Sequence, residues 1–198
     1  MNILRDHSGE GVTPGEAAEE EALVERARRD PRAFAPLYAR YADPVYRFCY
    51  RRLGEPEAAE DATSQVFLKA LAALPDYRSG SFRAWLFTIA RNVVTDIYRE
   101  RRPERLPDTA QDPIDPGPTP EEVMLQAESH RGVRALLAAL SPEQREVVEL
   151  RLAGLNGAEI AQVLGRSHGS VRALQYRAAQ RLRDVLAHGT QRGGAQCD

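Results

Sequence analysis

A proline-rich stretch near the middle of the chain most constrains how this sequence can fold. Residues 103–120 read PERLPDTAQDPIDPGPTP, with six prolines, one glycine, four acidic residues and a single arginine. Proline fixes φ, lacks a backbone donor and disfavours helix in the residue before it, so no helix continues through this stretch. Loops beyond about 12–15 residues are uncommon inside compact domains. We therefore expect a flexible acidic linker between two modules, with a long surface loop in one domain as the alternative.

Helix-start signals on both sides of this linker predict an all-α protein of two small helical domains. A full signal has an N-cap residue, then proline, then Glu or Gln at the third helical position. It occurs at Thr13-Pro-Gly-Glu16, Thr119-Pro-Glu-Glu122 and Ser141-Pro-Glu-Gln144, and without its third element at Asp30-Pro31 and Asp43-Pro44. Apolar residues then recur at helical spacing through 34–53, 66–74 and 82–98. No segment shows the alternation expected of a strand.

The sharpest local pattern, GAEIAQVLGRSHGSVRALQ at residues 157–175, predicts a helix-turn-helix. This motif needs a small residue where its helices cross, a flexible residue at the turn and apolar inner faces. Ala161 suits the crossing and Gly165 the turn. The expected inner faces comprise Ile160, Leu164, Val171 and Leu174, and the candidate N-caps are Asn156, with Glu159 completing its pattern, and Ser167.

Arginines after the predicted turn indicate DNA binding. Five of them fall between residues 166 and 183 with no acid among them: Arg166, Arg172, Arg177, Arg181 and Arg183. The planar guanidinium suits both phosphate oxygens and the guanine edge in the major groove. Arg172 and Gln175 are candidate base contacts, and Arg177 and Arg181 are candidate phosphate contacts. A solvated arginine-rich helix is the alternative interpretation.

The N-terminal module carries two further patterns. Residues 55–61 open a helix with acids in its first turns, which either complement the helix macrodipole or face a protein partner. Residues 78–102 hold six arginines against two acids, beside a flexible loop with aromatic neighbours. Such a loop can hold unstacked single-stranded bases. The spacing of Phe82, Trp85, Leu86 and Ile89 is instead typical of core, whereas Tyr77 is freer to be exposed.

Composition excludes several classes of protein. The apolar fraction of 42% supports real cores, and the longest apolar run, residues 135–140, is far shorter than the roughly 20 residues of a membrane span. No secretory signal is visible, and the two cysteines form no CxxC pair, so we expect a cytoplasmic protein without a metal site. No GxxxxGK or HExxH motif supports an enzyme. The net charge of −2 comes mostly from the linker, which masks the basic segments.

Four segments in order resemble the extracytoplasmic-function (ECF) sigma factors, the small specificity subunits of bacterial RNA polymerase. Residues 30–38 are similar to region 2.1, residues 57–68 to region 2.2 and residues 82–92 to region 2.3 running into region 2.4. Residues 140–146 and the helix-turn-helix are similar to region 4. The resemblance covers roughly residues 20–185.

The resemblance implies roles for particular residues. Core polymerase would be bound through the β′ clamp helices and the β flap, with Glu60, Asp61, Ser64, Gln65 and Phe67 as the polymerase-binding residues. The minus-ten promoter element would be opened by the loop 76–81 and the helix after it, through Tyr77, Arg78, Ser79, Arg91, Asn92, Asp96 and Arg99. The minus-thirty-five element would be read by Arg166, Ser167, Ser170, Arg172, Ala173, Gln175, Tyr176, Arg177 and Arg181.

The resemblance also implies a domain plan. We expect a frayed acidic extension at 1–19, a region 2 domain at 20–102, the linker at 103–120 threading toward the polymerase channels, a region 4 domain at 121–186 and a tail at 187–198. Ser64-Gln65 and Ala173-Leu174 depart from the residues that many members carry. The implied function is promoter recognition with polymerase and promoter DNA as partners, control by an anti-sigma factor, and no cofactor, small-molecule substrate or membrane insertion. A helix-turn-helix regulator that does not replace the sigma subunit is the alternative.

Overall fold

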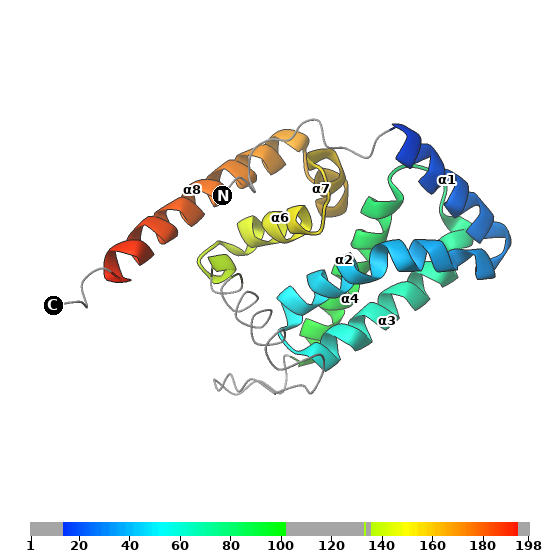
Figure 1. Cartoon of the computed structure of the whole chain (residues 1–198), viewed down its shortest axis with the longest axis horizontal. Coiled ribbons are helices and arrows are strands. Elements are labelled where there is room, and N and C mark those ends of the chain that lie inside the picture. The colour runs from blue at the N-terminus through cyan, green and yellow to red at the C-terminus, as the bar shows by residue number, and fades with distance from the viewer. Residues whose placement is uncertain (1–13, 102–132, 134–135, 194–198) are drawn as a thin grey trace.

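The computed structural model describes residues 14–101, 133 and 136–193, and every regular element in these ranges is helical (Figure 1). This confirms the all-α fold class. The linker at 103–120, the helix start at Thr119 and the segments 1–13 and 194–198 lie outside the described residues. Residues 14–19, which we expected to be frayed, form the first turns of helix α1.

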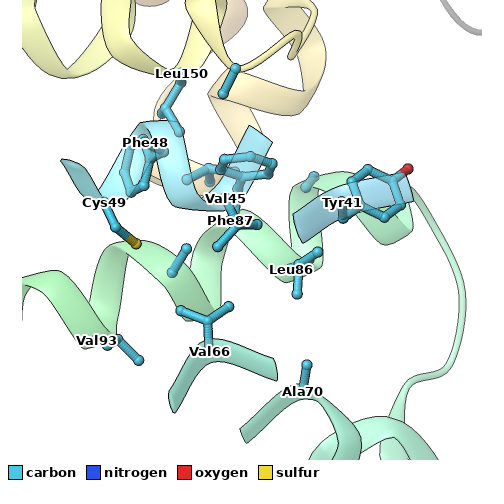
Figure 2. Close-up of a cluster of buried hydrophobic side chains, with 14 of the residues drawn as sticks. Tyr41, Val45, Phe48, Cys49, Val66, Ala70, Leu86, Phe87, Val93 and Leu150 are labelled. Carbon is cyan, nitrogen blue, oxygen red and sulfur yellow. The ribbon is translucent and has the colours of Figure 1, made fainter. Parts of the chain in front are cut away.

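The first domain is built from α1 (Pro14–Arg29), α2 (Ala35–Leu53), α3 (Pro56–Ala73) and α4 (Phe82–Arg101), with short 3₁₀ turns at Pro31–Phe34 and Leu74–Asp76. Helix α3 packs against both α2 and α4. The face of α2 that carries Val45 and Phe48 is fully buried and meets Phe87 of α4 and Val66 of α3 (Figure 2). The rings of Phe48 and Phe87 lie edge to face with centroids 5.6 Å apart.

The predicted helix start at Asp43-Pro44 is wrong, because Pro44 lies inside α2. A proline there removes one helical hydrogen bond and disfavours the conformation before it. The apolar face nevertheless runs without interruption from Leu37 through Tyr41 to Val45, and all three side chains are buried. Burial of this face outweighs the local cost of the proline. Asp43 does not cap a helix; its carboxylate accepts from Arg47 Nε at 2.9 Å on the helix surface.

The second domain contains α6 (Pro142–Leu152), α7 (Gly157–Leu164) and α8 (His168–Gly193), and it confirms the predicted helix-turn-helix. Asn156 accepts from the backbone N–H of Glu159 at 2.9 Å, while Glu159 accepts from the N–H of Asn156 at 2.8 Å. Gly165 ends α7 with φ +61°, in the left-handed region that favours glycine. Ser167 accepts from the N–H of Ser170 at 3.2 Å and caps α8. Ser141 and Gln144 form the corresponding capping box at α6.

The hydrophobic cores of the two domains are continuous. Leu150, Leu155 and Ile160 of the second domain are fully buried in the same cluster as the α2 and α4 residues of the first. Helix α7 contacts α4 and helix α6 contacts α2, so α6 and α7 lie between the first domain and α8 (Figure 1). Figure 2 shows Leu150 beside Phe48. A smaller cluster formed by Leu137, Leu140, Val148 and Ala178 holds α8 on its own domain.

Candidate nucleic-acid and partner-protein interfaces

Helix α8 presents an exposed basic face directly after the helix-turn-helix turn. Val171 and Leu174 face the core, which turns the intervening positions outward. Tyr176 is 63% exposed. Of the residues predicted to read the minus-thirty-five element, those exposed are Arg166, Ser167, Arg172, Ala173, Tyr176, Arg177 and Arg181, while Ser170 and Gln175 are half-buried. Arg172 and Arg177 offer exposed guanidinium groups on one helix, as binding to a DNA groove requires.

Two of these arginines also have partners within the domain. Arg166 forms an exposed ion pair with Glu143 at the start of α6. Arg181 donates through Nε to the carbonyl oxygen of Ala139 at 3.3 Å. Arg177 and Arg181 line an open groove of about 620 Å³ together with Tyr176 and Gln144. The ordered start of α6 thus lies alongside the basic face of α8.

The loop before α4 is pinned by aromatic contacts. The ring of Tyr77 lies 5.2 Å from that of Trp85 and 5.9 Å from that of Phe82, measured between centroids. Its hydroxyl donates to the carbonyl oxygen of Gly80 at 2.6 Å, and Gly80 has φ +110°. Burial, followed by the nearby Glu20 and Glu21, raises the pKa of Tyr77. Tyr77 is thus half-buried, whereas Phe82 is buried, and the Tyr77 ring shapes the loop through these contacts.

A cavity of about 360 Å³ lies beside this loop. Its walls come from α1, from the loop and from the start of α7, and they include Glu20, Glu21, Arg78, Ser79 and Asn156. The Arg78 and Ser79 side chains are exposed at its rim. The predicted base-capturing loop therefore lines this cavity, and part of the cavity wall belongs to the second domain.

The face of α4 that follows the loop is only partly free. Asn92, Asp96 and Arg99 are exposed, as expected of residues that face DNA. Asp96 lies 3.8 Å from Lys69 and 3.9 Å from Arg99 in exposed ion pairs. Arg91 is different, because its Nε donates to Glu146 Oε1 of helix α6 at 2.7 Å.

Helix α3 carries the residues predicted to bind polymerase. Glu60, Asp61, Ser64 and Gln65 are all exposed on one side of the first domain. Phe67 is instead only 6% exposed, so its placement on the contact surface is wrong. Its ring packs against those of Phe34 and Tyr38, with centroids 6.3 and 4.7 Å away.

Two apolar side chains on this side were missed from the sequence. Leu68 is 68% exposed and Tyr38 is 49% exposed, the latter resting on the Phe67 ring. Apolar residues at such exposed positions are typical of protein contact surfaces. The sequence did contain a signal for Leu68. It lies two positions after Val66, so helical spacing places it outside the buried face of α3.

Polar contacts tie the two domains together, and sequence reasoning found none of them. Arg52 Nη1 lies 3.0 Å from Glu149 Oε2, and Arg145 donates to the same carboxylate at 2.7 Å. Arg83 Nη1 donates to the carbonyl oxygen of Gly154 at 2.8 Å, and Ser81 Oγ to Glu159 Oε1 at 2.6 Å. An acid at position 149, between the buried Val148 and Leu150, was the one local sign of a buried charge.

A further network lies below the loop. The Tyr41 hydroxyl donates to the buried carboxylate of Glu20 on α1. Burial, with Glu20 adding to it, raises the pKa of Tyr41 well above its usual range. Burial acts to lower the pKa of Arg83, but Tyr41, Glu159 and Glu20 outweigh it and the pKa is raised. Arg83 therefore stays charged at the point where α1, α2, α4 and α7 meet.

These features define a helical DNA-binding protein with a helix-turn-helix domain joined to a second helical domain. Family models match in the same two places: Sigma-70 region 2 over residues 37–104 and Sigma-70, region 4 over residues 130–182. The chain is 34% identical over 151 residues to the ECF RNA polymerase sigma factor SigD of Mycobacterium tuberculosis, covering 72% of this chain and 71% of SigD. This chain belongs to the ECF RNA polymerase sigma factors.

Two further relatives extend the comparison. The chain is 41% identical over 171 residues to the ECF RNA polymerase sigma factor BldN of Streptomyces coelicolor, covering 83% of this chain and 64% of BldN. It therefore spans less than two thirds of the length of BldN. The structure of CnrH in complex with the cytosolic domain of CnrY is similar with a TM-score of 0.66 and 29% identity, covering 84% of this chain and 96% of CnrH.

Neither a membrane span nor a metal centre is found in the described part of the chain. None of its helices combines the length and the apolar character needed to cross a bilayer. Within the same residues, no three His, Cys, Asp or Glu side chains gather as a metal ion would require.

Proposed function

We propose that this chain binds core RNA polymerase and directs promoter-specific initiation of transcription as an ECF sigma factor. The observation that carries the proposal is the exposed arginine face of α8. This helix follows α7, which has a complete capping box at its start and ends at Gly165 in the turn. Family membership supplies the polymerase partner. The chain would act without catalysis of its own, in the cytoplasm, with the polymerase performing the chemistry.

In this proposal the second domain reads the minus-thirty-five element. Arg172 and Gln175 are the candidate base contacts, whereas Arg177 and Arg181 hold phosphates and set the register of the helix. The first domain opens the minus-ten element with the loop 76–81 and with Arg91, Asn92, Asp96 and Arg99. The bounds proposed for the two domains shift outward from the predicted 20 and 186, because α1 begins at Pro14 and α8 continues to Gly193 into the expected tail at 187–198.

The exposed side of α3 is the proposed polymerase contact. Glu60, Asp61, Ser64 and Gln65 supply polar groups there, and Leu68 with Tyr38 supplies apolar area. Asp61→Ala should weaken binding to core polymerase while leaving the DNA affinity of the chain unchanged. Asp43→Ala is the matched control, because Asp43 is also an exposed acid but lies on α2, outside this surface.

Regulation by a second protein is part of the proposal. CnrH is solved with the cytosolic domain of CnrY, and a comparable partner for this chain would be an anti-sigma factor. Such a partner would be recovered by co-purification with the full chain and would block its binding to core polymerase.

The deciding experiment combines the purified chain with core polymerase lacking other sigma factors. Genomic DNA fragments serve as templates, and transcript starts are mapped by sequencing. We expect transcripts that share two conserved elements upstream of their starts. If DNA is bound but the chain neither co-elutes with core polymerase nor supports any promoter-dependent transcript, the chain is a helix-turn-helix regulator and the proposal fails.

A further inference from the structure

Asp96 on α4 lies between two cationic side chains where α4 packs against α3. Its Oδ2 atom is 3.8 Å from Nζ of Lys69 on α3, and its Oδ1 atom is 3.9 Å from Nη1 of Arg99 on α4. All three side chains are open to solvent, since Asp96 is 50%, Lys69 54% and Arg99 78% exposed. Lys69 is the only lysine in the sequence and has no role in the proposed function.

These ion pairs add little to the packing of the two helices. Exposed pairs at such distances are screened by water and salt. Val66 of α3 and Val93 of α4 are already buried in the core that the two helices share (Figure 2). Bracing of α3 against α4 therefore does not account for the acid at this position.

Asp96 belongs to the row of residues proposed to face the minus-ten element. Asn92, Asp96 and Arg99 are four and three positions apart, so they lie on one face of α4, and all three are exposed. A carboxylate in such a row repels the phosphates of DNA. The two flanking cations offset this repulsion, because the group of three holds one negative and two positive charges.

The carboxylate of Asp96 remains able to accept hydrogen bonds. Both ion-pair distances are longer than an N–H···O hydrogen bond. An ionised carboxylate only accepts, so a base must offer it an N–H group. The exocyclic amino groups of adenine, cytosine and guanine meet this need, whereas thymine carries carbonyl oxygens on both sides of its N3–H. Repulsion between those oxygens and the carboxylate disfavours thymine.

We propose that Asp96 accepts a hydrogen bond from the exocyclic amino group of one base in the minus-ten element and thereby discriminates against thymine at that position. Lys69 is a positioning residue, which orients the carboxylate and acts through Asp96. The surface that reads DNA thus extends from α4 onto α3. This inference rests on the proposed function, because it takes the exposed row on α4 as the minus-ten surface.

The test compares two single strands that differ at one edge of the base. The strands are 20-nucleotide oligodeoxycytidine and oligodeoxyuridine, because uracil has a carbonyl oxygen in place of the amino group of cytosine. Fluorescence anisotropy gives the affinity of the full-length parent, of Asp96→Ala and of the control Glu100→Ala for each strand. Glu100 is an exposed acid one helical turn further along α4. Thermal melts followed by circular dichroism check that every variant is folded.

We expect the parent to bind oligodeoxycytidine about fivefold more tightly than oligodeoxyuridine. Asp96→Ala should bring this ratio close to one, mainly by strengthening the binding of oligodeoxyuridine, because a charge that repels its carbonyl oxygens is removed. Glu100→Ala should strengthen the binding of both strands alike and keep the ratio of the parent.

A second pair of variants tests Lys69. Lys69→Ala should weaken the binding of both strands, because a cation is lost, and should also lower the ratio between them. Lys69→Arg keeps the charge and should restore that ratio. A residue that only braced α3 against α4 would change the melting temperature and leave the ratio unchanged.

The inference would be overturned if the parent showed no preference for oligodeoxycytidine, if Asp96→Ala kept the parent's ratio, or if Glu100→Ala lowered it equally. An unchanged ratio in Lys69→Ala would overturn the role of that residue. These measurements need neither promoter nor polymerase. A chain that shows the preference but supports no promoter-dependent transcript loses the proposed function, whereas a chain that transcribes without the preference loses only this inference.

Discussion

Glu149 on α6 and Arg52 on α2 form an ion pair of 3.0 Å between residues 97 positions apart in sequence. The Glu149 side chain is fully buried, and its second partner, Arg145, also donates to the carbonyl oxygen of Arg51 at 3.0 Å. A buried carboxylate of this kind contributes little net stability when paired, but it is costly to leave without its partners. The contact between the domains is therefore apolar in its core, and the buried carboxylate of Glu149 favours the one arrangement of the two domains in which it meets its partners.

Loss of an interdomain apolar contact should destabilise both domains together. Leu150→Ala removes a fully buried side chain and should cost about 2–5 kcal/mol in the free energy of unfolding. Trp85 is the single tryptophan and lies in the first domain, so its fluorescence reports on the domain that was not mutated. We expect its midpoint in urea to fall with the midpoint of far-UV circular dichroism. Leu152→Ala, at a position 37% exposed, is the control. If the urea midpoint measured by Trp85 fluorescence did not change, the two domains would unfold independently of each other.

The N-cap of α7 should contribute measurable stability. Asn156→Ala removes the acceptor for the backbone N–H groups of Ala158 and Glu159, both 2.9 Å away. The expected loss is about 1 kcal/mol by urea denaturation. Gln162→Ala, an exposed change in the same helix, should shift the curve by less than about 0.5 kcal/mol. Equal shifts for the two variants would contradict the capping role.

Pro44→Ala should stabilise the chain. Pro44 interrupts the hydrogen bonding of α2, and alanine would restore a backbone donor inside the helix. The expected gain in unfolding free energy is about 1–3 kcal/mol, measured by thermal and urea denaturation. Pro36→Ala provides the comparison, because Pro36 lies in the first turn of the same helix, where a proline is tolerated. A gain as large at position 36 would point to a general effect of proline removal.

Arg172→Ala should weaken binding to the minus-thirty-five element by about 1–3 kcal/mol and relax the preference at one base position. The position of Arg172 suits this role, because its side chain is exposed directly after the buried Val171. Arg177→Ala should instead weaken binding to all promoter variants alike, as a phosphate contact does. Affinities would be measured by anisotropy across single-base variants of the mapped element. A uniform loss for Arg172→Ala would make it a phosphate contact too.

Cys49 should make the chain less stable in alkali. Burial raises the pKa of its thiol to about 12, while an unfolded cysteine ionises near pH 8.5. Above about pH 8.5 the unfolded state therefore binds fewer protons than the folded state, so stability falls as pH rises toward 12. The slope from this group approaches about 1.4 kcal/mol per pH unit. Between pH 8.5 and 10, Cys49→Ala should flatten the curve of urea midpoint against pH, and Cys197→Ser should not.

Features that depend on near neighbours in the chain were predictable from the sequence. The capping box at Asn156 and Glu159, the turn at Gly165 and the inner face at Val171 and Leu174 all rest on spacings of a few residues. Proline was harder to interpret, because Asp43-Pro44 carries a helix-start pattern although it lies inside α2, whereas Pro36, in the first turn of α2, follows an alanine. Only the continuity of the buried face across position 44 distinguishes a helix interior from a helix start.

Features that depend on distant partners were not predictable. Nothing near Arg91 in sequence indicates its contact with Glu146. The Tyr77 ring packs against Phe82 and Trp85 only because the loop folds back on α4. Phe67 and Leu68 are adjacent apolar residues, yet one is buried and the other exposed. Helical periodicity assigns faces, but the packing of α3 on its neighbours decides which face is covered.

Glu159 uses its two carboxylate oxygens for different purposes. Oε2 accepts from the backbone of its own helix start at 2.8 Å, whereas Oε1 accepts from Ser81 in the other domain at 2.6 Å. The bond at Oε2 does not depend on Ser81, so the capping of α7 and the contact with the first domain use separate acceptor atoms of one side chain. A change at position 81 therefore alters the neighbour of α7 without removing the acceptor that caps it.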